Sequence, residues 1–161
     1  MNISIGTDRE YRSLMEECIE LAKQSPRGSR GIRGPYVGAI VLDRQRKVVG
    51  RGYKDIIPAT EMILHAERIA LEKAHDRAKG GTIITTLEPC VHLKRSQVLS
   101  SCSDLIIRMG IKKVVIGAME NSQHIHSGIG MNYLRSKGIE VVQYLALSER
   151  IYEELLHKLE K

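Results

Sequence analysis

The residues of this 161-residue chain best suited to chemistry are one histidine, one glutamate and two cysteines: His65, Glu67, Cys90 and Cys102. An imidazole and two thiolates can hold zinc at three of its four tetrahedral positions and leave the fourth for water. Zinc-bound water loses a proton near neutral pH, and a nearby carboxylate can carry that proton. We therefore predict that His65, Cys90 and Cys102 bind Zn2+ and that Glu67 is the catalytic acid and base.

These residues lie in two short motifs, His65-Ala-Glu67 and Glu88-Pro-Cys90. Each motif alone is weak, because a His-x-Glu pair is commonly an exposed helix start and a cysteine is commonly a buried spectator. Together they match the zinc-deaminase signature, in which one His and two Cys hold the metal and a Glu transfers protons. That signature has two residues between its cysteines, whereas eleven separate Cys90 from Cys102 here.

The elements that must position these residues follow from hydrophobic periodicity, which alternates between helical and strand spacing. We expect helices over 8–23, 65–79, 98–109, 131–137 and 149–160, and strands over 36–43, 47–53, 82–87, 113–117 and 139–144. Asp8 would cap the first helix, and residues 54–64 would form a loop. This alternation predicts an α/β sheet in two or three layers and one domain over residues 1–161.

His65 and Cys90 would then both be held by rigid secondary-structure elements. His65 would begin a helix, and Cys90 would follow a strand and Pro89, at a position where another helix can start. Because a helix N-terminus favours negative charge, such a position would favour the thiolate form of Cys90.

At these residues the sequence resembles the cytidine-deaminase-like superfamily, and within it the pyrimidine deaminases of riboflavin biosynthesis. That family also separates its two cysteines, and its intervening segment is matched by His92 and Arg95, with Ser96 in place of a threonine. The resemblance extends over about residues 8–145. It implies a three-layer fold with a central mixed five-stranded sheet flanked by helices, assembled into homodimers or homotetramers.

The resemblance also implies a reaction. A zinc-dependent hydrolytic deaminase would remove the exocyclic amine of a free N-heterocycle, a pyrimidine-type nucleotide as in riboflavin biosynthesis. Glu67 would move the proton from the activated water to the ring nitrogen and the leaving amine. His92, Lys94, Arg95 and Ser96 would face the substrate, because their donors suit a ribose phosphate. The alternative is that Lys94 and Arg95 simply point to water.

The sequence departs from that family around the expected pocket. Gly34 stands before Pro35 where the family has an asparagine, and Lys54 replaces a histidine after the second strand. The segment from Lys54 to His65 and the gap between the cysteines are both longer. Because the metal set is unchanged, these departures are consistent with the same chemistry on a different heterocycle.

Composition restricts the remaining choices. Three cysteines, no apolar leader at the start and no apolar run of about 20 residues favour a reduced, cytoplasmic protein without a membrane span. Cys18 falls in the apolar stripe of the first helix and is expected in the core. The net charge of +6 is scattered, with one denser stretch at residues 27–33 that is either a solvated surface or a phosphate-attracting one.

Two other functions stay open. The first is the same chemistry on a nucleoside or free base, or on a polynucleotide as in tRNA adenosine deaminases, which share the Thr86-Leu-Glu-Pro-Cys90 run. The wide cysteine gap and the absence of Phe and Trp disfavour nucleic acid without excluding it. The second is a non-catalytic zinc module, against which Glu67 argues.

His124 and His126 are expected to be loop residues, and Gly128-Ile-Gly130 is too short for a dinucleotide-binding motif.

Overall fold

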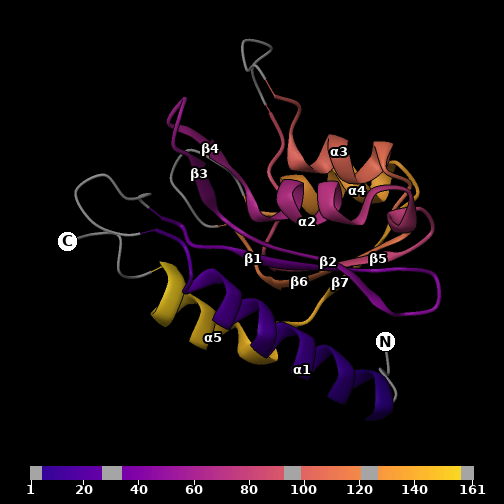
Figure 1. Cartoon of the computed structure of the whole chain (residues 1–161). Coiled ribbons are helices and arrows are strands. Elements are labelled where there is room, and N and C mark those ends of the chain that lie inside the picture. The colour runs from indigo at the N-terminus through magenta and orange to yellow at the C-terminus, as the bar shows by residue number, and fades with distance from the viewer. Residues whose placement is uncertain (1–4, 27–33, 93–98, 121–126, 157–161) are drawn as a thin grey trace.

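A five-stranded sheet with helices on both faces forms the centre of the molecule (Figure 1). The computed structural model describes residues 5–26, 34–92, 99–120 and 127–156. The strands of the sheet are, in spatial order, β2 (Val48–Tyr53), β1 (Gly38–Leu42), β5 (Thr82–Leu87), β6 (Lys113–Ala118) and β7 (Glu140–Gln143). The expected mixed five-stranded sheet of a three-layer α/β fold is therefore confirmed.

The strand directions place several loops at one edge of the sheet. β1 is antiparallel to both β2 and β5, whereas β5, β6 and β7 run parallel. Parallel strands have their carboxyl ends at the same edge, which is where ligand sites of α/β sheets commonly lie. The segments that follow Leu87 and Ala118 accordingly leave the sheet side by side, and Leu87 pairs with Ala118.

The helices cover the two faces unequally. Figure 1 shows α1 and α5 on one face and α2, α3 and α4 on the other. Their bounds are α1 (Ile5–Ala22), α2 (Ala66–Ala74), α3 (Cys102–Arg108), α4 (Ile129–Ser136) and α5 (Ser148–Ile151), the last continued by a π-helical segment, η3 (Tyr152–Leu156). Two 3-10 segments are η1 (His75–Ala78) and η2 (Leu145–Leu147).

The core lies on both faces of the central strands, between them and the covering helices. β1 is buried along its whole length, and α1 contributes a fully buried stripe that includes Met15 and Cys18. The Cys18 thiol donates to the Ile84 carbonyl at 3.6 Å. The expected core role of Cys18 is confirmed.

Two glycines of β2 let α2 rest directly on the strand backbone. A Cβ at Gly50 would lie 2.1 Å from the Ala70 carbonyl oxygen, and one at Gly52 would lie 2.4 Å from that of Ala66. Such distances are far inside van der Waals contact, so only glycine permits this approach. The close packing fixes the N-terminal turn of α2, which carries His65 and Glu67.

Several expected boundaries were wrong. α1 begins at Ile5, so Asp8 lies in its first turn, where its charge still suits the helix dipole, rather than at the cap. α3 begins at Cys102 instead of residue 98, because the Ser101 hydroxyl caps it by accepting from the Asp104 N–H at 3.0 Å. α2 gives way to η1 after Ala74, since the helix tightens before the turn at Gly80–Gly81.

The largest correction concerns residues 54–64, which form a hairpin instead of a loop. β3 (Asp55–Ile57) pairs antiparallel with β4 (Met62–Leu64) in a separate two-stranded sheet. Pro58 lies in the turn between them, where the ladder does not need its missing N–H. The hairpin projects from the end of the central sheet beside α2 (Figure 1).

Some expectations fall outside the described residues: the basic stretch at 27–33, Val98, His124, His126 and the last turns of the C-terminal helix beyond residue 156. Within the described residues, the helices are too short or too polar to cross a lipid bilayer.

Candidate active site

His65, Cys90 and Cys102 come together from three different elements. His65 immediately precedes α2, Cys90 follows β5, and Cys102 is the first residue of α3. The His65 Nδ1 lies 3.6 Å from the Cys90 Sγ and 3.4 Å from the Cys102 Sγ, and all three ligand atoms lie within 4.8 Å of one another. Zn–N and Zn–S bonds of ordinary length in a tetrahedron separate N and S by roughly 3.6 Å. The three side chains therefore fit zinc.

The surroundings of the cysteines favour one thiolate before any metal binds. The pKa of Cys90 is lowered to about 4, chiefly by the hydrogen bond from the Cys102 thiol, with further contributions from His65 and the Cys102 N–H. That N–H donates to the Cys90 Sγ at 3.3 Å. The same hydrogen bond, together with burial, raises the pKa of Cys102. The hydrogen bond to Cys90 raises the pKa of His65.

No helix starts at Cys90, although the sequence indicated that one can start there. Residues 88–92 are not helical, because Cys90 lies in the segment that leaves the sheet after β5. The helix N-terminus that favours the Cys90 thiolate is the first turn of α3, beginning at Cys102. The lowered pKa of Cys90 agrees with the expected thiolate, but its largest cause is the Cys102 thiol, and α3 contributes through the Cys102 N–H.

Glu67 lies in the first turn of α2 and is only 4% exposed. It lines a cavity of about 200 Å³ whose walls also include Cys90 and His65. The rest of the lining is Pro35, Val37, Lys54, Ala66, Leu87, Glu88 and Glu120. Burial raises the pKa of Glu67, and the positive charge of His65 opposes that rise. A carboxyl group with a raised pKa is suited to both taking up and returning a proton.

Glu88 is a second buried carboxylate in the same cavity, and sequence reasoning assigned it no role. One of its oxygens accepts from the N–H groups of Glu120 at 3.3 Å and Gly128 at 3.0 Å. The other accepts from the Met131 N–H at 2.9 Å, in the first turn of α4. Glu88 therefore joins the end of β6 to the start of α4. The sequence feature that points to Glu88 is its position directly before the Pro89-Cys90 pair.

The Gly128-Ile-Gly130 segment has a packing role beside Glu88. A Cβ at Gly130 would lie 2.2 Å from the Pro89 carbonyl oxygen, so only glycine allows α4 to pack against the segment carrying Cys90.

Arg68 fixes the approach to Cys102 and was also missed. Its side chain is largely buried, and its guanidinium donates to the Ser100 carbonyl at 2.8 Å and the Ser100 hydroxyl at 3.0 Å. It also pairs with Glu72 at 3.6 Å on the same helix. Its position on the turn that carries Glu67 was the available signal, but its partner is 32 residues away in sequence.

A second cavity, of about 280 Å³, also borders the metal ligands. Its lining combines the three ligands with Met62, Ile63, Arg68, His92, Leu99 and Ser100. Of the predicted substrate contacts, His92 is thus placed beside the metal cluster. Lys94, Arg95 and Ser96 lie outside the described residues.

Comparison with known sequences relates the chain to zinc-binding deaminases. A sequence model of the family described as "Cytidine and deoxycytidylate deaminase zinc-binding region" matches residues 8–118. The chain is 40% identical over 134 residues to the riboflavin biosynthesis protein RibD of Aquifex aeolicus, covering 83% of this chain and 34% of that protein. It is 39% identical over 107 residues to the diaminohydroxyphosphoribosylamino-pyrimidine deaminase of Buchnera aphidicola, covering 66% of this chain and 67% of that protein.

Comparison with solved structures gives the same result. The fold matches a diaminohydroxyphosphoribosylaminopyrimidine deaminase/5-amino-6-(5-phosphoribosylamino)uracil reductase of Thermotoga maritima with a TM-score of 0.71 and 33% identity. That match covers 92% of this chain and 40% of the Thermotoga chain. The chain thus spans well under half the length of the RibD protein of Aquifex and of the Thermotoga protein.

The matched region, residues 8–118, contains His65, Glu67, Cys90 and Cys102, and the zinc cofactor expected from them is the one in the family's description. The resemblance drawn from the sequence is confirmed. The chain belongs to the cytidine and deoxycytidylate deaminase zinc-binding family, and its relatives include the pyrimidine deaminases of riboflavin biosynthesis.

Proposed function

We propose that this chain is a zinc-dependent deaminase that hydrolyses the exocyclic amine of a free pyrimidine-type heterocycle. The observation that carries the proposal is the position of Glu67, a buried carboxyl group with a raised pKa in a cavity that also contains zinc ligands. A purely structural zinc site has four protein ligands and needs neither an open position nor an acid and base. The three-ligand set with an adjacent cavity supports catalysis over a structural module.

The mechanism assigns the proton transfers to Glu67. His65, Cys90 and Cys102 would hold the zinc, which would supply the Lewis acidity that makes water a nucleophile near neutral pH. Glu67 accepts a proton from the attacking water and gives it to the ring nitrogen, then carries the second proton to the departing amine. A C–O bond forms at the ring carbon, the C–N bond breaks, and ammonia leaves.

The walls of the cavity suit a ring. Pro35, Val37 and Leu87 give it apolar surface close to Glu67, which limits competing water. Its volume of about 200 Å³ lies below the roughly 300–1,000 Å³ of pockets that enclose drug-sized ligands. The ring would fit inside while a larger substituent stays outside.

The substrate proposed for this chain is based on that of the related proteins. We propose a phosphorylated pyrimidine as in riboflavin biosynthesis, with His92, Lys94, Arg95 and Ser96 toward the ribose phosphate. His92 supports this by lining the cavity beside the metal ligands. We also propose a cytoplasmic homodimer or homotetramer. The location is supported by three unpaired thiols, two of them in the metal cluster.

An ammonia-release screen tests the proposal. Zinc-loaded, chelator-treated and zinc-reloaded protein would be incubated with aminopyrimidine nucleotides, cytidine and guanine derivatives, their unphosphorylated forms, and tRNA. We expect release from one pyrimidine-type compound that disappears on chelation and returns with zinc. Release from tRNA alone would establish the polynucleotide alternative instead. Stoichiometric zinc with no release from any compound would leave the non-catalytic module and overturn the proposal.

A further inference from the structure

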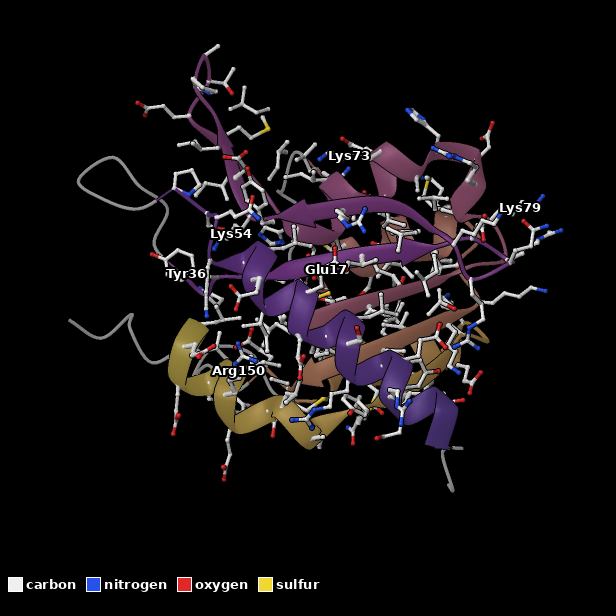
Figure 2. The ribbon with its side chains drawn as sticks, turned by 60° about the horizontal axis from the view of Figure 1, so that its bottom comes forward. Glu17, Tyr36, Lys54, Lys73, Lys79 and Arg150 are labelled. Carbon is white, nitrogen blue, oxygen red and sulfur yellow. The ribbon has the colours of Figure 1, made fainter. Side chains whose placement is uncertain are left out.

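A lysine shares the cavity with Glu67. Lys54 lies between the end of β2 and the start of β3, and Figure 2 shows it at the same end of the sheet as Tyr36. Its Nζ donates to the Pro35 carbonyl at 3.3 Å, and its backbone N–H donates to the Val37 carbonyl at 3.2 Å. Pro35 and Val37 line the cavity too. Lys54 is therefore held against one wall of the cavity by the segment that leads into β1.

The charges around Lys54 place its ammonium near the reacting groups. Burial lowers the pKa of Lys54, and the nearby carboxylates of Glu67 and Glu120 partly oppose that change. The positive charge of Lys54 in turn acts on His65. Among the described residues that line this cavity, Lys54 is the one lysine or arginine. A half-buried lysine amine that lines a cavity offers hydrogen-bond donors to an electron-rich atom of a bound ligand.

The size of the cavity limits which atom that is. At about 200 Å³ it takes a heterocyclic ring, and a ribose phosphate would extend beyond it. The acceptor nearest Lys54 would then belong to the ring. An oxo oxygen conjugated with the amine-bearing carbon gains negative charge as water adds, so a donor at that oxygen stabilises the transition state more than the ground state.

We propose that Lys54 determines specificity by donating a hydrogen bond to an oxo group of the heterocycle. The inference rests on the proposed deaminase function and adds to it one specificity-determining residue of this chain, Lys54. Lys54 on one side and Glu67 on the other then fix the ring in the cavity. A ring without the oxo group loses this contact and reacts more slowly.

The test compares paired substrates in three zinc-loaded variants. The pair is the aminopyrimidine turned over by the wild type and its counterpart without the oxo group, each as nucleoside and nucleotide. Lys54→Met should lower kcat/KM on the oxo substrate by roughly 100-fold, as expected for one lost donor to a developing oxyanion. It should leave the rate on the counterpart within about twofold, because that ring has no acceptor to lose.

Two further variants serve as rescue and control. Lys54→Arg keeps a cationic donor and should recover part of the preference for the oxo substrate. Lys79→Met removes an exposed lysine at the opposite end of the sheet (Figure 2) and should change neither rate. Zinc content and thermal unfolding of each variant separate a folding defect from a change in specificity.

Several outcomes would overturn the inference. An equal loss on both rings would make Lys54 a structural residue, and a loss confined to nucleotides would mean that it binds the phosphate. An active wild type with unchanged Lys54→Met kinetics would refute the role of Lys54 alone. A wild type that releases no ammonia from any ring would refute the proposed function, and this inference with it.

Discussion

The floor of the candidate active site and its rim are built in different ways. The floor, defined as His65, Cys90 and Cys102, is held at the ends of β5, α2 and α3, elements that pack on the main sheet. The rim, defined as the β3–β4 hairpin, is a separate two-stranded sheet with Met62 37% and Ile63 44% exposed. The chemistry is thus positioned by the core, whereas one wall beside it can change without disturbing the core.

The same contrast appears between two buried glutamates of one cavity. Glu88 accepts three backbone N–H groups and fixes the start of α4. Glu67 is equally buried, and burial raises its pKa. A carboxylate satisfied by backbone donors contributes stability, whereas one with a raised pKa is suited to proton transfer.

The largest effect should come from removing a ligand of the floor. Cys102→Ala should weaken zinc affinity by well over 100-fold, more than the loss of a group that only supports a ligand. Cys18→Ala is the matched control, since it removes a buried thiol from the core and should keep stoichiometric zinc with a loss of roughly 1 kcal/mol in unfolding free energy. Metal analysis and thermal unfolding of both variants distinguish them; full zinc binding by Cys102→Ala would place the third ligand elsewhere.

Zinc affinity should rise steeply with pH. In the metal-free protein, His65 and Cys102 have raised pKa values, whereas Cys90 is a thiolate above its pKa of about 4. At about pH 6 zinc must therefore displace one proton from His65 and one from Cys102, so affinity should change by up to about 100-fold per pH unit. Calorimetric titration in buffers of different ionisation enthalpy counts the protons. Zinc binding without proton release would contradict the thiolate assignment.

Replacing Glu88, whose hydrogen bonds join segments next to the metal ligands, should lower the free energy of unfolding. Glu88→Gln replaces one acceptor oxygen by an amide that faces backbone N–H groups, so at least one buried donor loses its partner. We expect a loss of about 1–3 kcal/mol in unfolding free energy, measured by denaturant titration. Glu72→Gln, an exposed change on α2, should be nearly neutral. If Glu88→Gln were as stable as the wild type, the three hydrogen bonds would have no structural role.

The rim should show the smallest effect on folding. Ile63→Ser alters an exposed side chain and should change the unfolding free energy by less than about 0.5 kcal/mol. Ile40→Ser, at a fully buried position of β1, should lose several kcal/mol. Parallel denaturation curves report both. A large destabilisation by Ile63→Ser would show that the hairpin is part of the core.

The metal cluster and the main sheet could be predicted because their signals are local or strongly periodic. The His65-Ala-Glu67 and Glu88-Pro-Cys90 motifs lie at element ends, and the apolar runs of β1, β5 and β6 have the lengths typical of buried strands. The three zinc ligands could be predicted from residue types once both motifs were expected at the same edge of the sheet.

Other parts depend on tertiary contacts that spacing does not show. The hairpin was missed because Pro58 and mixed polarity within residues 54–64 suggest a loop. The partners of Glu88 lie up to 43 residues away, and Arg68 reaches Ser100 across 32 residues. The start of α3 depended on the Ser101 cap, which competes with the apolar spacing that suggested an earlier start.

The most direct test of the account is the activity of zinc-loaded Glu67→Gln. This change keeps the size of the side chain and removes its ability to accept a proton, so zinc should stay stoichiometric while ammonia release falls by roughly 100- to 10,000-fold. Glu72→Gln on the same helix should retain full activity. A Glu67→Gln protein that releases ammonia at the wild-type rate would contradict the assignment of Glu67 as the proton carrier.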